Sequence, residues 1–300
     1  MNFLMSIPSP EISFIDLGPV RIHFYALFIL TGIVIASLIA DAKLSRRGAE
    51  KGVFLDIALW AVPAGILGGR LFHVITHPRD YFYEGADLLA IFRIWEGGLA
   101  IYGAITLGAV GAWWGARQAG IRFSAVLDAA APGLLLAQGL GRIGNYFNQE
   151  LFGIPTTLPW GLEISPANPA YPIGLPDGLL FHPTFLYELL WNFAGAALLL
   201  YLASKLNLQW GKVFGLYLVI YSVGRIWIES IRIDPSEIIL GLRINIWSAL
   251  IGITIGVAII WVQNRRHPGA EPSVFAPGRE PAEEGTASDP SEDALGKNEN

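Results

Sequence analysis

The chain has 300 residues and a net charge of −5; 53% of its residues are apolar, only 15% are charged, and its mean hydropathy is +0.48. Soluble domains carry about 25% charged residues, so this composition argues against an ordinary soluble enzyme. The absence of cysteine excludes disulfide bonds, a thiol nucleophile and thiolate metal ligation by the chain itself. The five histidines show no metal-ligand spacing, and we expect neither a metal nor another cofactor.

Seven apolar runs are candidates for membrane-spanning helices, each of which needs about 20 residues. In chain order they are residues 24–40, 53–75, 97–116, 124–141, 189–204, 213–224 and 244–264. The fourth and sixth runs are short by hydropathy alone. The pattern predicts an all-α, polytopic membrane protein with seven transmembrane helices in one domain over residues 1–267.

Lysine and arginine in the short connections indicate the orientation, because cytoplasmic loops are enriched in both. The connections after runs one, three, five and seven together hold ten of these basic residues, and the other side holds four. We therefore expect the N-terminus outside and the C-terminus in the cytoplasm. The first run has no basic segment before it and no small-residue cleavage site after it, which favours a retained helix over a signal peptide.

Two segments lie outside the predicted helices. Residues 145–181 form a long outer loop rich in proline and glycine, and its aromatic residues favour an ordered cap at the membrane interface. Residues 268–300 are rich in proline, glycine and serine, and residues 271–300 hold eight acidic residues against two basic ones. Such a segment buries too little apolar surface to offset the loss of conformational entropy, so we predict a disordered acidic tail.

Three arginines, Arg70, Arg142 and Arg225, stand near the ends of apolar runs, each directly after a glycine. The predicted topology puts all three near the outer leaflet, where basic residues are disfavoured and an intramembrane charge costs at least a few kcal/mol. A single arginine at a helix end can snorkel to the headgroups without any function. Three on one side, each beside a glycine that admits a close neighbour, instead indicate a bound anion.

Polar residues near these arginines extend the candidate site. Glu229 lies four residues after Arg225 and three before Arg232, so helical spacing places all three on one face. Glu229 either orients the arginines or forms a plain ion-pair staple between helices. Residues 141–153 add amide donors and glycines at membrane depth. Arginine forks fit phosphate, and a phosphate at this level belongs to a phospholipid.

These motifs resemble the signature of the bacterial prolipoprotein diacylglyceryl transferase family. The longest matching block is Gly-Arg-Ile-Gly-Asn at residues 141–145, followed by Asn148, Glu150 and Gly153. The other matching blocks, in the expected order, are residues 23–25, 68–70, 95–103, 182–183 and 187–188, and then Tyr221, Gly224, Arg225, Glu229 and Arg232. The resemblance covers residues 12–266 and leaves out the acidic tail.

The resemblance implies a transferase of the bacterial cytoplasmic (inner) membrane with its active site toward the outer, periplasmic side. Such an enzyme moves the diacylglyceryl group of phosphatidylglycerol to the lipobox cysteine thiol in the signal peptide of a preprolipoprotein. A thioether forms and glycerol 1-phosphate leaves, which is the first step of bacterial lipoprotein maturation. The expected partners are these two substrates and the lipid bilayer, with no nucleic acid.

Motif matches also imply the site residues. The catalytic candidates are Arg142, Arg225, Tyr102, Glu150, Tyr25 and His23. The substrate-binding candidates are Arg142, Asn145, Asn148, Gly153, Arg70, Tyr221, Glu229 and Arg232. Some family members have a histidine, proposed as the thiol base, where this chain has Tyr102. Tyr102 therefore either takes the thiol proton or positions the substrate by a hydrogen bond, and His23 and Tyr25 are the other candidate bases.

Two other functions stay open from the residues alone. A phospholipid transporter would use the same arginines to bind headgroups, but it needs a polar path through the inner half of the membrane. Runs one, three, five and seven contain no charge, which argues against such a path. A structural membrane subunit would use the arginines only as ion-pair partners and would tolerate their replacement by lysine.

Overall fold

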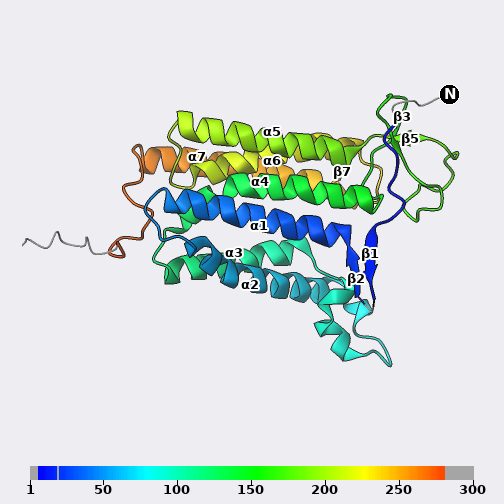
Figure 1. Ribbon diagram of the computed structural model, residues 1–300, viewed down its shortest axis with the longest axis horizontal. Coiled ribbons are helices and arrows are strands. Elements are labelled where there is room, and N and C mark those ends of the chain that lie inside the picture. Colours follow the sequence, from blue (N-terminus) through cyan, green and yellow to red (C-terminus); the bar gives the residue numbers. More distant parts are fainter. Residues whose placement is uncertain (1–5, 19, 281–300) are drawn as a thin grey trace, which may run out of the picture.

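In the part of the chain that the structure describes, seven long helices run alternately in opposite directions along the longest axis of the molecule (Figure 1). They are α1 (Phe24–Ser45), α2 (Val53–Thr76), α3 (Ile101–Gln118), α4 (Phe123–Phe147), α5 (Thr184–Lys205), α6 (Lys212–Ile231) and α7 (Ile244–Arg266). This computed structural model describes residues 6–18 and 20–280. Among these residues, six helices are long and apolar enough to cross a membrane, and α3 is the one long helix outside that set. The chain is therefore a polytopic membrane protein.

Helices α4, α5 and α6 extend the furthest beyond the apolar runs predicted from hydropathy. Helix α4 continues to Phe147 and α6 to Ile231, so Arg142 and Arg225 lie inside helices rather than just beyond them. The predicted outer loop from residue 145 is correspondingly shorter. Helix α5 begins at Thr184, which makes Glu188 helical. Arginine and glutamate are good helix formers, so the end of an apolar run does not end the helix.

Helix α3 starts later than predicted, at Ile101 instead of residue 97. Gly97 and Gly98 have φ values of 93° and 73°, which exclude them from a right-handed helix. They end the connection from α2, which contains three short 3-10 helices, Pro78–Asp80, Leu88–Phe92 and Ile94–Glu96. This 77–100 connection therefore turns sharply before the chain re-enters the bundle.

Close helix contacts through small residues hold the bundle together. Helix α4 packs against α1, α5 and α6 and is the most buried of the six candidate spans. A Cβ at Gly133 of α4 would lie 2.7 Å from the Cα of Ala36 in α1. In the α2–α3 pair, Gly68 and Gly103 face each other so closely that a Cβ on either would clash with the other's carbonyl. Small residues allow this approach, which is the usual basis of helix association in bilayers.

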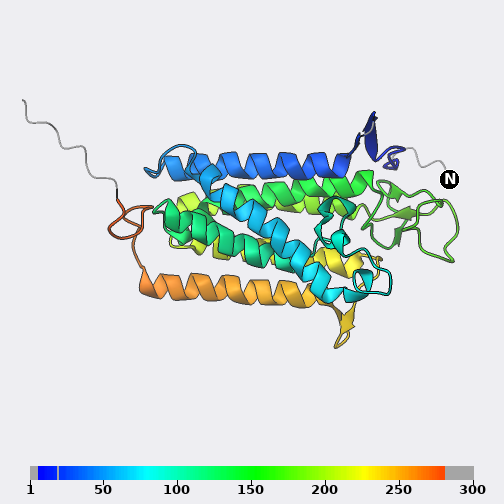
Figure 2. The same ribbon diagram turned by 90° about the horizontal axis from the view of Figure 1, so that it is seen from below.

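The outward faces of the helices are apolar. Leu59 of α2 is 72% exposed and Trp261 of α7 is 56% exposed. Helix α7, the least buried candidate span, lies along one edge of the molecule (Figure 2). Water would not favour such a surface, whereas acyl chains would cover it without cost. These faces therefore fit a lipid environment.

All the strands gather at one end of the bundle, which we call the strand-bearing end (Figure 1). There β1 (Phe14–Leu17) pairs antiparallel with β2 (Val20–His23), Phe14 opposite His23. The loop between α4 and α5 forms a small antiparallel sheet in the order β3-β5-β4, and a last hairpin precedes α7. Those strands are β3 (Pro155–Thr156), β4 (Leu162–Glu163), β5 (Leu180–Phe181), β6 (Ile238–Ile239) and β7 (Leu242–Arg243).

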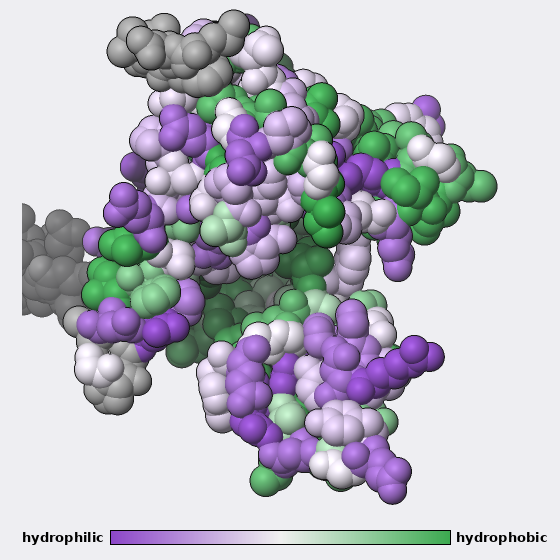
Figure 3. Space-filling view, turned by 90° about the vertical axis from the view of Figure 1, so that its right-hand side faces the viewer, coloured by the Kyte–Doolittle hydropathy of each residue, from purple (hydrophilic) through white to green (hydrophobic). Residues whose placement is uncertain are grey.

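The loop between α4 and α5 has its own apolar core, built around Phe152, Leu162 and Phe181. The prediction that this loop is ordered therefore agrees with its structure, and its role as a cap stays a prediction. Viewed toward the strand-bearing end, the molecule is hollowed between two lobes, and the depth of the hollow is hydrophobic (Figure 3).

At the opposite end of the bundle, the segment after α7 folds back onto the helices. Val274 has no exposed surface, and its carbonyl accepts a hydrogen bond from the Arg122 amide. The buried Glu271 forms ion pairs with Arg47 and Arg122. The prediction of disorder is therefore wrong for residues 268–280, because specific partners offset a composition typical of disorder. Residues 281–300 of the predicted tail lie outside the described residues.

Candidate active site

Arg142 of α4 and Arg225 of α6 line the same pocket, which has a volume of about 610 Å³. Helices α1, α3, α4, α6 and α7 all contribute to its walls. Six of the residues proposed from sequence lie in this lining: Tyr25, Tyr102, Arg142, Asn145, Tyr221 and Arg225. We call this cavity the arginine pocket. Residues separated by up to 200 positions in the chain thus converge, as the anion-site hypothesis requires.

A buried carboxylate from α5 joins the two arginines. Glu188 is only 5% exposed, and one of its oxygens lies 2.5 Å from Arg142 Nε. Its other oxygen accepts a hydrogen bond of 3.2 Å from Arg225 Nη1. Because one carboxylate holds both guanidinium groups, the distance between them is set by the protein rather than by a ligand.

The ion pairs continue from Arg225 toward the strand-bearing end. Arg225 Nη2 lies 3.0 Å from Glu229, which is completely buried and also pairs with Arg232 and Arg243. The helical spacing of Arg225, Glu229 and Arg232 is therefore confirmed as an ion-paired face. Asp234 completes the network with bonds to Arg232 and Arg243. Together with Arg142, four arginines share the three carboxylates of Glu188, Glu229 and Asp234.

Amide side chains orient Arg142 from the other side. Arg142 Nη1 donates a hydrogen bond of 3.0 Å to the Asn145 oxygen, and the Asn145 amide donates to Glu150 at 2.8 Å. Asn148 donates to the same Glu150 oxygen at 3.0 Å. Asn148 and Glu150 are absent from the pocket lining, so both reach the pocket only through Asn145. Arg142 Nη2 has no partner among the described residues.

Three tyrosines surround the charged groups. The Tyr102 hydroxyl lies 2.7 Å from Ser248 Oγ, which connects α3 to α7 across the pocket. Tyr25 packs directly on α4, because a Cβ at Gly144 would lie 2.6 Å from its ring. The ring of Tyr221 stacks on that of Tyr217. These hydroxyls join Asn145 and Ser248 as uncharged hydrogen-bonding groups in the pocket lining.

The deeper wall of the arginine pocket is apolar. Ile29 and Ile33 from α1, Ile105 from α3 and Leu134 from α4 line it. An anion at the arginines would therefore sit at one end of a cavity whose remainder suits hydrocarbon. This combination fits an amphiphile better than a soluble anion.

Arg70 does not join the site, which corrects the sequence prediction. Its side chain is buried, lies outside the pocket lining and stacks on the ring of Tyr81. Its five hydrogen bonds go to main-chain carbonyls of Ala90, Ile91, Arg93, Gly97 and Gly98. Arg70 thus supports the 77–100 connection, and its charge is satisfied by peptide dipoles instead of a ligand.

Four further predicted residues lie outside the pocket lining: Glu229, described above, and His23, Gly153 and Arg232. His23 is exposed where β2 meets α1, with its ring edge-on to Phe14. Gly153 bonds to the His182 carbonyl and pairs with Arg232 in an isolated bridge, so its role is to join the loop to the end of α6. Arg232 touches the arginine pocket only through Glu229.

Sequence reasoning missed Glu188 and Arg243 as site residues. Glu188 belongs to a motif that matches the family, but its charge stands just before an apolar run and looks like a helix end. One signal could have identified Glu188: the charge of Arg142 at membrane depth requires a counter-charge, and a carboxylate on another helix would supply it. In the sequence, Arg243 resembles an ordinary basic residue of a connecting loop, yet its Nε donates a hydrogen bond of 2.7 Å to Glu229. Only the packing of α6 against α7 brings them together.

The described residues contain no group of three or more histidine or acidic side chains arranged to hold a metal ion. Fold and site thus define a polytopic membrane protein with a pair of arginines in the lining of a largely apolar pocket. Sequence comparison agrees with this class, since the sequence model of the prolipoprotein diacylglyceryl transferase family matches residues 12–262. The chain belongs to this family.

Curated relatives cover most of the chain. A phosphatidylglycerol–prolipoprotein diacylglyceryl transferase of Leifsonia xyli subsp. xyli is 52% identical over 93% of this chain and 87% of its own length. Phosphatidylglycerol–prolipoprotein diacylglyceryl transferase 2 of Streptomyces coelicolor is 48% identical over 89% and 84%. A relative with the same activity name from Bifidobacterium adolescentis is 48% identical over 87% and 81%.

Proposed function

We propose that this protein transfers the diacylglyceryl group of phosphatidylglycerol to the cysteine thiol of preprolipoproteins, the first step of lipoprotein maturation. The names of its relatives support both substrates. The observation that carries the site assignment is the convergence of Arg142 and Arg225, braced by Glu188, on one pocket with an apolar interior.

The reaction exchanges one bond at a glycerol carbon of the lipid. The thiolate sulfur attacks that carbon, a carbon–sulfur thioether bond forms, and the carbon–oxygen bond to phosphate breaks. Glycerol 1-phosphate leaves with the electron pair of the broken bond, and its negative charge grows as it departs. Guanidinium groups already oriented toward the phosphate stabilise this developing charge without reorganisation.

The arginine pocket has room for both parts of the lipid. Arg142 Nη2 and Arg225 Nε, which have no partner among the described residues, are the donors that we assign to the phosphate. Asn145 and Tyr221 add hydrogen-bonding groups nearby. Ile33, Ile105 and the other apolar lining residues would receive the first part of the acyl chains. Two sets of residues outside the pocket lining position the donors. Asn148 and Glu150 act on Asn145 and through it on Arg142, and Glu229 and Arg232 act on Arg225.

The acceptor thiol comes from the substrate, since the chain has no cysteine. We propose a lipobox cysteine in a signal peptide as that acceptor. A free thiol has a pKa near 8.5, so a positive field or a base must favour the thiolate. The guanidinium groups of Arg142 and Arg225, which line the arginine pocket, provide the field. Tyr102 and Tyr25 line the arginine pocket and stay candidates for proton transfer or positioning, whereas His23 lies outside its lining.

We further propose that all seven helices cross the bacterial cytoplasmic membrane as one domain, with the strand-bearing end on the outer side. Helix α3 is less apolar than the others, but it packs along α2 from Gly103 to Gly115. Basic residues are concentrated at the opposite end, as cytoplasmic loops require. The carboxyl end of the chain would then be cytoplasmic.

A single reaction tests the proposal. The full-length protein in detergent is mixed with phosphatidylglycerol and a lipobox peptide, and the peptide is analysed by mass spectrometry. We expect the mass of one diacylglyceryl group on the cysteine and stoichiometric release of glycerol 1-phosphate. A peptide with serine in place of cysteine should stay unmodified. Absence of product from folded, lipid-supplied protein would refute the assignment.

A further inference from the structure

A second cavity, of about 350 Å³, lies at the end of the bundle opposite to the arginine pocket. Helix α4 forms its floor between α1 and α5, and Figure 1 shows α4 lying between these two helices. Lys43, Arg46 and Arg47 line one side of it, at the end of α1 and just beyond. Leu200 and Leu208 line the other side. We call this cavity the basic groove.

Among the described residues, two of the three cations in the basic groove have no hydrogen bond or ion pair, although the Asp128 carboxylate interacts electrostatically with Lys43. Arg47 is held by Glu271, as described above. Asp128, on the floor of the groove, accepts hydrogen bonds from the backbone amides of Gly211 and Phe214 at 2.8 and 2.9 Å. Both of its carboxylate oxygens are therefore bonded to the first turn of α6. The side chains of Lys43 and Arg46 make no hydrogen bond or ion pair with any described residue.

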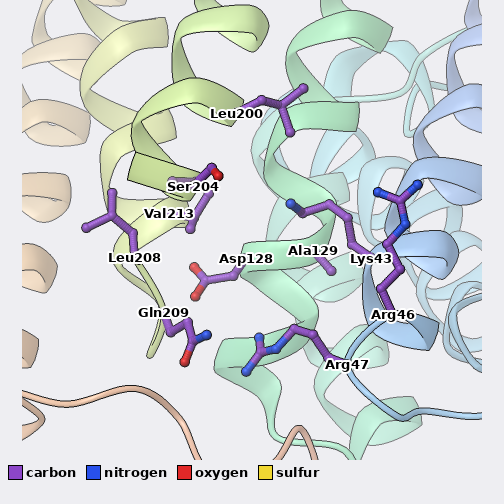
Figure 4. Close-up of a pocket in the computed structure, with 11 residues that line it drawn as sticks. Lys43, Arg46, Arg47, Asp128, Ala129, Leu200, Ser204, Leu208, Gln209 and Val213 are labelled. Carbon is purple, nitrogen blue, oxygen red and sulfur yellow. The ribbon is translucent and has the colours of Figure 1, made fainter. Parts of the chain in front are cut away.

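The stick view shows how the polar groups are placed (Figure 4). The Lys43 amine extends from α1 over the cavity, and Asp128 lies beside it on α4. Ser204 and Gln209 stand across the cavity on the α5 side. A ligand held here would therefore meet the Lys43 amine on one side, hydrogen-bonding side chains on the other, and the Asp128 carboxylate on the floor.

We propose that the basic groove binds the phosphate ester of an anionic phospholipid, at a site separate from the arginine pocket. Lys43 and Arg46 would contact the phosphate, and Ser204 would bond to the headgroup. Cations at the end of membrane helices are costly without a counter-charge, and basic pockets between such helices are suited to lipid headgroups. The proposal does not depend on the transfer reaction.

The apolar flank favours a lipid over other anions. Leu200 is 42% exposed and the adjacent Tyr201 is 57% exposed, so acyl chains can lie along α5 directly from the groove. A soluble phosphate ester would leave this surface uncovered. The acidic residues 281–300 of this chain carry suitable charge but no apolar complement to the groove.

The test measures lipid retention by the full-length protein carrying Arg142→Gln, which disables the arginine pocket. Native mass spectrometry follows its release from nanodiscs of phosphatidylcholine containing a minor fraction of phosphatidylglycerol. We expect one phosphatidylglycerol to be retained in preference to phosphatidylcholine. Adding Lys43→Gln and Arg46→Gln should weaken that retention about 30-fold, because each basic residue near an anionic surface contributes about a factor of five.

The matched control removes two other basic residues at the same end of the bundle, Arg117→Gln and Arg265→Gln. Neither lines the basic groove, so retention should be unchanged. A second arm offers glycerol phosphate in detergent, and we expect no comparable binding. If glycerol phosphate bound as well as phosphatidylglycerol, the groove would bind phosphate esters but its ligand would be a soluble one rather than a lipid.

Two results would overturn the proposal. One is equal loss of lipid in the groove variant and in the control, which would show a diffuse effect of charge. The other is retention that appears only after deletion of residues 281–300, which would make the acidic segment the occupant. With an intact arginine pocket, the Lys43→Gln, Arg46→Gln variant should keep transferase activity within about twofold in excess phosphatidylglycerol, so failure of the proposed function is recognised separately.

Discussion

Arg70 and Arg142 share a local sequence and the same end of the molecule, yet they have opposite surroundings. All the hydrogen bonds of Arg70 go to main-chain carbonyls of one connection. Arg142 is held by Glu188 and Asn145, lines the arginine pocket and has no partner for Nη2 among the described residues. A guanidinium group enclosed by backbone stabilises a fold, whereas one braced from a single edge can also bind a ligand.

The largest effect on activity should come from Arg142→Lys. Lysine keeps the charge but loses the fork that bonds to Glu188, Asn145 and phosphate together. We expect transfer to fall by about 10²–10³-fold, as for the loss of one preorganised donor to a developing anion. Turnover of lipobox peptide at saturating phosphatidylglycerol measures it.

Arg117→Lys is the matched control for that variant. It is the same substitution, but Arg117 lies on α3 outside the lining of the arginine pocket. It should leave turnover within about twofold. If the folded Arg142→Lys variant also had normal turnover, Arg142 would have a purely structural role, as Arg70 does, and the contrast between the two arginines would disappear.

Glu188→Gln should produce the next largest loss. Glutamine keeps the size of the side chain but cannot hold both arginines by charge, so their spacing becomes looser. A displacement of about 1 Å in a reactive site can reduce the rate by about 100-fold. We expect a decrease of about 10–100-fold in kcat/KM. Glu163→Gln, an exposed change on β4, is the control.

Tyr102→Phe separates the two roles left for this residue. If its hydroxyl positions substrate through the bond with Ser248, we expect KM to rise about tenfold, as the loss of one hydrogen bond implies, with little change in kcat. That is the outcome we predict. A fall in kcat of about 10² or more, with a shifted pH–rate profile, would instead assign proton transfer to Tyr102.

Arg70→Lys should have the smallest effect on activity and the clearest effect on stability. Lysine cannot reach five carbonyls at once, and buried acceptors left unpaired should destabilise the protein by about 3 kcal/mol. This corresponds to a melting temperature lower by about 6–12 °C. Activity per folded molecule at low temperature should stay within about threefold. A 100-fold loss without a stability change would place Arg70 in the site.

Much of the site was predictable from sequence. The pairing of Arg225, Glu229 and Arg232 follows from helical spacing, and six proposed residues share the arginine pocket. The role of Glu188 was not predictable, because its partners come from two other helices. That residues 268–280 are structured could not be predicted for the same reason, because Glu271 pairs with arginines from two distant connections.

Local chemistry thus accounts for what the amino acids alone reveal: apolar runs that require a membrane, arginines that require a counter-charge, and a motif that identifies the family. These properties depend on neighbours within a few positions along the chain. Which arginine binds backbone and which faces a cavity depends on helices that approach within a few ångströms. Only the assembled bundle brings Glu188 between Arg142 and Arg225 and encloses Arg70 in the 77–100 connection.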